Sequence, residues 1–308
     1  MTNTPDAPQN GKTLLLSHEA TDELLDQVNR QLAEDKFNHQ DQELIWQMVE
    51  CLGDTRGLVR LGFAEALGVV GKPAVDTLIE ALLHHSNEVV RRAAGKTLTL
   101  IEDPVAVPHL IHALLNDEDT VVQASAIGAL ARIGIASVKP LLEVLASPNS
   151  SESNKGHAAW GLAFIGAPAK EQLYQAYNSD SPEVRAAVVG AIAKVVEEDH
   201  RDIQSLDLLV NALQDNVADV RSEAAAVLGN LKYPPAIPVL LELLHHSEPQ
   251  TRKSAALSLM KIGDRTAIPA LQTALEQESN PQIQKAIALA VSLLQKQVAT
   301  PVDDDWAE

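Results

Sequence analysis

The sequence is poor in cysteine, in aromatic residues and in basic residues. Its single cysteine, Cys51, excludes an internal disulfide framework and a cysteine-rich metal site. Aromatic residues supply only 3% of the chain although hydrophobic residues supply 45%, so the apolar mass is aliphatic and suits helices better than strands. The 24 basic against 42 acidic side chains give a formal charge of −18, which disfavours nucleic acid and anionic membrane surfaces as partners.

Long apolar runs and a secretory start are also missing. No segment approaches the roughly 18 consecutive apolar residues that a membrane-spanning helix needs. The first residues, MTNTPDAPQNGK, lack the charged and apolar regions of a signal peptide. We therefore expect a cytoplasmic protein with no membrane insertion.

A repeated segment dominates what the sequence does contain. The stretch LVRLGFAEALG from Leu58 recurs as VVRRAAGKTLT from Val89 and again further along the chain. Equivalent positions in successive copies are Arg60, Arg91, Gln123, Lys155, Arg185, Arg221, Arg252 and Gln284. Their spacings are 31, 32, 32, 30, 36, 31 and 32 residues, and the long step coincides with an enlarged connection at 197–205. Units this short cannot bury their apolar faces alone, so neighbouring units must stack.

Each unit is predicted to form two helices. In the first of them, Val59, Phe63 and Val70 follow the spacing of an amphipathic helix. Glycines that would end such helices in a left-handed conformation are Gly71, Gly134, Gly166 and Gly263. Prolines at or near the start of the second helix are Pro108, Pro140, Pro238 and Pro269. The shortage of aromatics follows, because helices stacked at constant spacing favour small and medium side chains.

The two ends depart from the repeat. Residues 1–12 are predicted to be disordered, 13–56 to form an N-terminal helical cap, 57–297 to form the repeat array and 298–308 to form an acidic disordered tail. The acidic tail is predicted to serve solubility, and the alternative is that it is a docking peptide anchored by Trp306.

The sequence offers no catalytic constellation. It contains no GxxxxGK[ST] phosphate loop, no GxSxG elbow and no HExxH pair. Cys51 stands in the apolar register WQMVECLG and predicts a buried structural thiol rather than a nucleophile. His157 lies on a first helix, where a packing or capping role is predicted for it. Catalytic residues therefore stay unassigned, and no metal site is predicted.

Two recurrent polar patterns indicate structural roles. The pairs His84-His85 and His245-His246 would close second helices, where they complement the helix dipole. They lie five units apart and so cannot share a metal. Acidic residues precede the repeat arginines, which predicts Asp/Glu–Arg ladders between neighbouring units rather than a basic ligand-binding stripe.

A polar column on the second helices is the candidate partner face. Aligning those helices places in register Glu80, His112, Glu143, Gln175, Asn211, Glu242 and Thr273, which we call the polar column. Second helices of such superhelices are expected on the concave side, the surface that solenoids use for binding. His109, Trp160, Tyr174 and Tyr177 are near the column in sequence and join it in the prediction. A merely solvated helix face is the alternative.

The repeats resemble HEAT repeats, and their shortened form is similar to that of cyanobacterial phycobilin lyases of the E/F type. The related non-bleaching factor B family of phycobilisome degradation shares it. Two stretches carry the resemblance, Val90–Leu114 with its EDPVAVPHLIHAL segment and Ile262–Leu271, within a likeness that covers roughly 45–290. The resemblance implies an all-α, right-handed α-solenoid of about eight HEAT-like two-helix repeats plus the N-terminal helical cap.

The same resemblance implies a function. Family members attach bilin to, detach it from, or escort it to a cysteine of a phycobiliprotein subunit, or act in antenna degradation. It implies no permanently bound cofactor, but a transient bilin of the phycocyanobilin type, and a hetero-oligomer, since E-type and F-type lyases work as heterodimers. No family catalytic motif can be placed here, so enzymatic activity stays open. The alternative is a non-catalytic general scaffold for protein–protein interaction.

Overall fold

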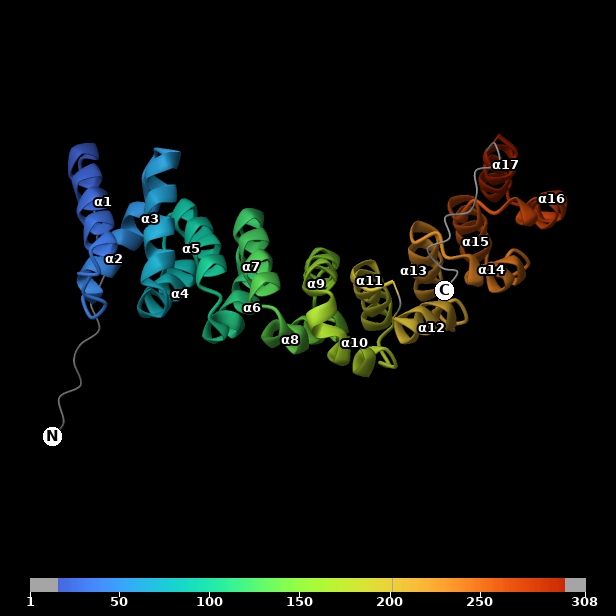
Figure 1. The fold of residues 1–308 in the computed structure, drawn as a ribbon, viewed down its shortest axis with the longest axis horizontal. Coiled ribbons are helices and arrows are strands. Elements are labelled where there is room, and N and C mark those ends of the chain that lie inside the picture. The colour runs from blue at the N-terminus through green and yellow to red at the C-terminus, as the bar shows by residue number, and fades with distance from the viewer. Residues whose placement is uncertain (1–15, 201, 297–308) are drawn as a thin grey trace. The chain divides into compact units, whose positions relative to one another are not determined.

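The structure is a computed structural model that describes residues 16–200 and 202–296, and all regular elements in these ranges are helical (Figure 1). The predicted disordered ends, with Trp306, lie outside the described residues. The chain divides into two compact units, Met1–Ser137 and Val138–Glu308. The all-α repeat architecture expected from the sequence is confirmed.

Unit 1 holds the N-terminal helices and the first regular repeats. Short 3₁₀ turns, Cys51–Gly53, Lys72–Ala74 and Pro104–Ala106, join several of its helices. The α-helices are α1 (His18–Ala33), α2 (Gln42–Glu50), α3 (Gly57–Val70), α4 (Val75–His84), α5 (Glu88–Ile101), α6 (Val107–Asn116) and α7 (Thr120–Ile133). The boundary between the units falls inside α8 (Ile135–Ala146).

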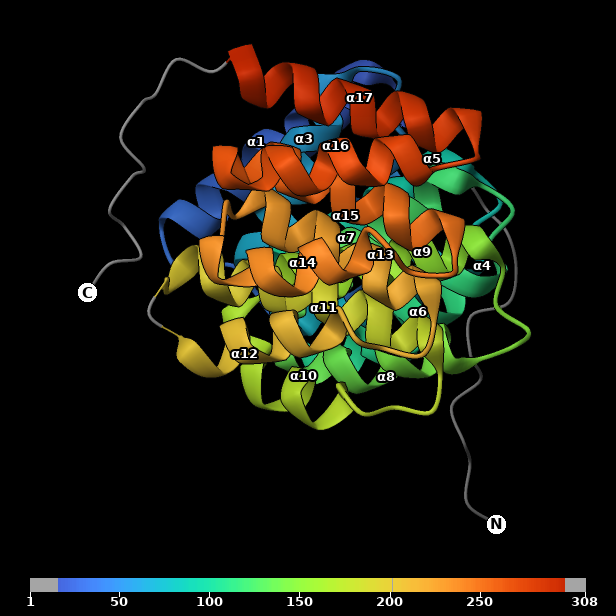
Figure 2. The same cartoon turned by 90° about the vertical axis from the view of Figure 1, so that its right-hand side faces the viewer.

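Unit 2 continues the alternation of first and second helices. Its first helices are α9 (Glu152–Ile165), α11 (Pro182–Glu198), α13 (Ala218–Asn230), α15 (Pro249–Ile262) and α17 (Pro281–Lys296). Its second helices are α10 (Lys170–Ala176), α12 (Ile203–Ala212), α14 (Ile237–Leu243) and α16 (Ile268–Gln277). The two sets form separate layers, and Figure 2 looks onto the second helices stacked in order.

Local signals in the sequence set the helix ends. All four predicted glycines adopt positive φ, for example 70° at Gly71 and 87° at Gly263. Side-chain caps begin many first helices, as when Asp119 accepts hydrogen bonds from the backbone N–H groups of Val121 and Val122. Three of the predicted prolines lie in the first turn of a second helix. Pro140 lies inside α8, because in that repeat the turn before the second helix is itself helical.

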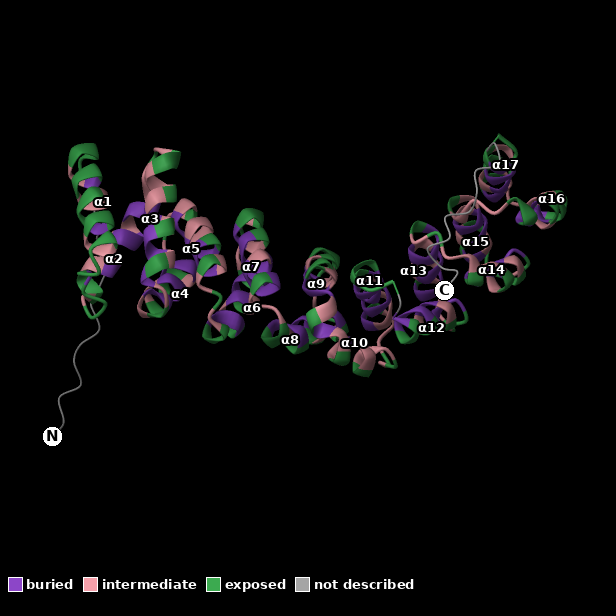
Figure 3. Ribbon diagram, viewed as in Figure 1, coloured by how far each residue is buried: buried purple, intermediate pink, exposed green. Residues whose placement is uncertain are grey.

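The core lies between the two helix layers of each unit. Buried residues gather on the facing sides of first and second helices, whereas the outer sides are exposed (Figure 3). Leucines such as Leu78, Leu110 and Leu141 make up most of the largest fully buried side chains, with Phe63 among them. Burying aliphatic side chains supplies the main driving force for folding, and alanine keeps neighbouring first helices close.

The repeat arginines form the predicted ladder. Each Arg side chain donates to the backbone carbonyl six residues earlier, as from Arg91 to His85 O at 3.0 Å and from Arg252 to His246 O at 2.9 Å. At four of the five repeat arginines the same guanidinium also forms an ion pair with a carboxylate of the next repeat. These ion pairs are Arg91–Asp117, Arg185–Asp215, Arg221–Glu248 and Arg252–Glu278. One side chain therefore fastens the end of one repeat to the next.

A groove on the first helices of unit 2

The seven members of the polar column are all exposed. They lie on successive second helices from α4 to α16, in the register that the alignment predicts. The His112 imidazole lies 3.4 Å from the side-chain amide of its helical neighbour Asn116, and the Thr273 hydroxyl donates to Pro269 O within α16. His109 is half-buried on α6. The role of the column as a partner face stays a prediction.

Tyr174 and Tyr177 are used inside unit 2. The Tyr174 hydroxyl lies 2.7 Å from Ser205 Oγ and donates to Asp202 Oδ2 at 3.1 Å. Asp202 also forms an ion pair with Lys170. The Tyr177 hydroxyl donates to Leu208 O at 2.9 Å. Both tyrosines thus join second helix α10 to α12 beside the enlarged connection, which leaves their hydroxyls little capacity for a partner.

Trp160 lies on first helix α9, in a different layer from the polar column. Its side chain is 51% exposed, and its ring centroid is 5.3 Å from that of Phe164, which is 59% exposed. Within unit 2 the first helices follow the inner side of the bend (Figure 1), where the sequence analysis expects second helices. Small side chains explain this difference, because they let the first helices approach one another more closely.

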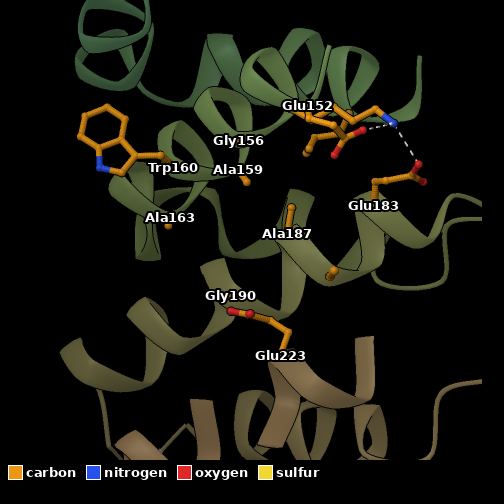
Figure 4. Close-up of a pocket in the computed structure, with 12 residues that line it drawn as sticks. Glu152, Gly156, Ala159, Trp160, Ala163, Glu183, Ala187, Gly190 and Glu223 are labelled. Atoms are coloured by element: carbon orange, nitrogen blue, oxygen red, sulfur yellow. Dashed lines mark hydrogen bonds and ion pairs between the residues drawn. The ribbon is translucent and has the colours of Figure 1, made fainter. Parts of the chain in front are cut away.

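A groove with a volume of about 460 Å³ opens between α9 and α11. Its walls are made largely by glycine and alanine, and Trp160 lies at one end with its ring directed away from α11 (Figure 4). The lining residues are Leu145, Glu152, Lys155, Gly156, Ala159, Trp160, Ala163, Glu183, Ala186, Ala187, Gly190 and Glu223. Volumes of this size are typical of small-molecule sites in proteins.

Charged side chains occupy two places in the groove. At the end opposite Trp160, Lys155 Nζ lies 2.9 Å from Glu183 Oε1 and 3.9 Å from Glu152 Oε1 (Figure 4). This pairing lowers the pKa of Glu183 to about 2, with help from Ser181 and the backbone. Glu223 reaches in from α13, and burial raises the pKa of its carboxyl.

The cysteine and the histidines considered in the sequence analysis have surroundings that are typical of structural roles. Cys51 is buried, as predicted, and burial raises the pKa of its thiol to about 11. Imidazole Nδ1 of His85 accepts the Asn87 N–H, and that of His246 accepts the Glu248 N–H, each at 3.0 Å. His157 is half-buried on α9. Across the described ranges, none of the helices is long and apolar enough to cross a membrane.

Glu223 and Gly156 line the groove but are not among the site residues predicted from the sequence. Alignment of the repeats shows a feature of the sequence that marks each of them. Glu223 stands where the neighbouring repeats have Ala187 and Ser254, and Gly156, Trp160 and Phe164 follow one another at a spacing of four residues along one helix face.

Comparison with known proteins identifies a family and two relatives that match this sequence. The HEAT-repeat family matches residues 43–131, 138–217 and 206–292. The bilin biosynthesis protein MpeU of Synechococcus sp. (strain WH8020) is 38% identical over 283 residues, covering 91% of this chain and 95% of that protein. An uncharacterized phycocyanin operon protein Z of Pseudanabaena tenuis (strain PCC 7409) is 32% identical over 164 residues, 49% of this chain and 77% of that protein.

Solved structures agree on the fold alone. A chain of the Kap95:Nup1 complex superposes with a TM-score of 0.51 at 15% identity, covering 94% of this chain and 47% of that one. The sequence relatives go further, because one of them matches along nearly its whole length. The chain belongs to the HEAT-repeat proteins of the phycobilin lyase E/F-type and non-bleaching factor B family, the family that its repeat signature resembles.

Proposed function

We propose that this protein is an accessory factor that handles bilin chromophores for phycobiliproteins, by attaching, detaching or escorting them. The observation that carries the proposal is the match to a bilin biosynthesis protein over 95% of that protein's length. The partial match to a phycocyanin operon protein points to the same antenna system.

The chemistry of the chain fits a factor that works on another protein's cysteine. Its single thiol, Cys51, is buried and has a raised pKa, so it is poorly suited to carry a bilin as a thioether. The cysteine that bonds to the bilin would then belong to the antenna subunit. In this arrangement the repeat array supplies surfaces that hold the two reactants together.

A non-catalytic scaffold is the second candidate. It is favoured by the polar column, whose members are exposed on second helices of both units. An adaptor in antenna degradation would use the same surface and need no pigment site.

The deciding experiment mixes the purified protein with apo-subunits of phycobiliproteins, with and without free phycocyanobilin. Size-exclusion chromatography reports co-elution, and visible absorbance after denaturation in acid urea reports covalent attachment. A faster or more selective covalent product than the subunit forms alone supports an attaching role. Co-elution without covalent change supports an escort or adaptor, and neither co-elution nor spectral change contradicts the proposal.

A further inference from the structure

We propose that the groove between α9 and α11 is a bilin-binding site, in which the conjugated rings lie along the small-residue walls toward Trp160 and the pyrrole nitrogens face Glu223. The inference rests on the proposed function and adds the place and orientation of the pigment. It is argued from the groove's shape, its exposed aromatic pair and its carboxylate.

The shape suits a flat and elongated molecule. The groove is lined by glycines and alanines of α9 and α11, whose small size leaves a slot between the two helices. A Cβ atom added at Gly156 would meet nothing within 4 Å, so this stretch of wall is open. Added at Gly190, it would lie 3.0 Å from Glu223 Oε1, so the absence of a side chain there makes room for the carboxylate.

The aromatic pair is the second feature. Only 3% of the residues are aromatic, yet Trp160 and Phe164 are both more than half exposed on one face of α9. Their ring centroids lie 5.3 Å apart with an interplanar angle of 31°, and of the two residues Trp160 lines the groove. Aromatic side chains in water are suited to stacking against flat conjugated ligands.

Glu223 is the third feature. Among the described residues its carboxylate makes no hydrogen bond or ion pair, whereas Glu183 in the same groove pairs with Lys155. It is partly buried against Gly190, in walls that are mostly apolar. A carboxylate in such surroundings is costly unless donors reach it. Pyrrole N–H groups of a bilin are donors of the required kind, and a protonated pyrrole would add a charge of opposite sign.

Charge also fixes the orientation of the ligand. Three carboxylates, Glu152, Glu183 and Glu223, line the groove against the single cation Lys155. These carboxylates would repel the two propionates of a bilin, which would therefore point to solvent. The edge of the bilin that carries the pyrrole nitrogens would turn inward. An anionic ligand without N–H donors fits this groove poorly.

The test is a titration of free phycocyanobilin into the purified full chain, followed by absorbance and induced circular dichroism. Gly156→Phe would fill the slot, and its matched control is Gly128→Phe, a glycine of α7 that also has open space and lies outside the groove. Trp160→Ala removes the aromatic end, with Leu289→Ala, an exposed residue in the same repeat register on α17, as control. Glu223→Gln removes the charge and keeps the shape.

We expect Gly156→Phe to weaken bilin binding at least tenfold, and Trp160→Ala and Glu223→Gln to weaken it by about tenfold each, as expected for loss of one stacking or one charged contact. Both controls should keep the wild-type affinity. Far-UV circular dichroism and melting should be unchanged for Gly156→Phe, because the new side chain enters open space on a helix.

The outcomes separate this inference from the proposed function. If wild type binds bilin and all three groove variants bind it equally well, the site is wrong and the function stands. If Gly156→Phe abolishes co-elution with antenna subunits but leaves bilin affinity intact, the groove binds protein and the inference is overturned. If wild type binds neither bilin nor antenna subunits, the proposed function and this inference both fail.

Discussion

At the scale of single residues, Cys51 shows how surroundings decide chemistry. It follows α2 at the start of a 3₁₀ turn, with Glu50 and Asp54 close by. Burial is the main cause of its raised pKa, and the two carboxylates add to it. The neutral thiol is thereby favoured, and the thiolate is the reactive species.

We expect Cys51 to resist alkylation in the native protein. With a pKa of about 11, only about one thiol in a thousand would be ionised at about pH 8, against roughly a quarter for an unperturbed thiol. Iodoacetamide labelling followed by mass spectrometry should be slow under native conditions and fast in concentrated urea. Native labelling at the unfolded rate would show an accessible thiol and would return Cys51 to consideration as a nucleophile.

At the scale of helices, the arginine ladder links one repeat to the next. Arg252 is the clearest case, because its Nε and Nη2 lie 2.7 and 2.9 Å from the two carboxylate oxygens of Glu278. The Glu278 side chain is only 2% exposed. Because a repeat array gains much of its stability from the interfaces between neighbours, such a link should act beyond its own helix.

We predict that Arg252→Ala destabilises the protein by roughly 3 kcal/mol, since it leaves the buried Glu278 charge without its partner. Lys253→Ala, which removes the exposed neighbouring cation, should have little effect. Urea unfolding followed by circular dichroism measures both. Equal stability of the two variants would mean that the Arg252–Glu278 pair is not a structural link.

The same pair predicts a pH dependence. Pairing with Arg252 lowers the pKa of Glu278 from 4.5 to about 2, so the folded state holds the proton less tightly than the unfolded chain. The stabilisation is therefore complete above about pH 4.5 and is lost as the pH falls toward 2. The stability difference between wild type and Glu278→Gln should shrink over that window, and Glu276→Gln, at an exposed position of the helix that Glu278 caps, serves as the control for a carboxylate outside the pair. A difference that stays constant with pH would contradict the assignment.

The contrast between ladder and groove shows what the sequence can predict. Helix pairs, turn glycines and the ladder repeat in every copy, so a constant period reveals them. The groove depends on what one copy does differently, such as Glu223 replacing a small residue. Trp160 is predicted to join the polar column because it is near the column in sequence, yet the two helices of a repeat belong to different layers. Side-chain direction and layer are tertiary properties that spacing alone does not give.

At the scale of the whole molecule, the carboxylates behind the charge of −18 include two contrasting classes. Ladder acids such as Asp117 and Asp215 are neutralised by the arginine of the preceding repeat. Glu80, Glu143 and Glu242 of the polar column are exposed and, among the described residues, their carboxylates make no hydrogen bond or ion pair. The unpaired class is free to attract a partner of opposite charge, an effect that weakens with salt.

We therefore predict that the double variant Glu80→Lys with Glu143→Lys binds antenna subunits more weakly, by about tenfold at low salt, while its far-UV circular dichroism stays unchanged. Glu23→Lys with Glu65→Lys makes the same change in net charge on exposed first-helix positions and serves as control. Because the polar column and the groove lie in different helix layers, the column variant should keep its affinity for free bilin. Surface plasmon resonance at two salt concentrations measures the effect. Equal loss in both double variants would assign recognition to net charge alone, and no loss in either would identify the column as a solvated helix face.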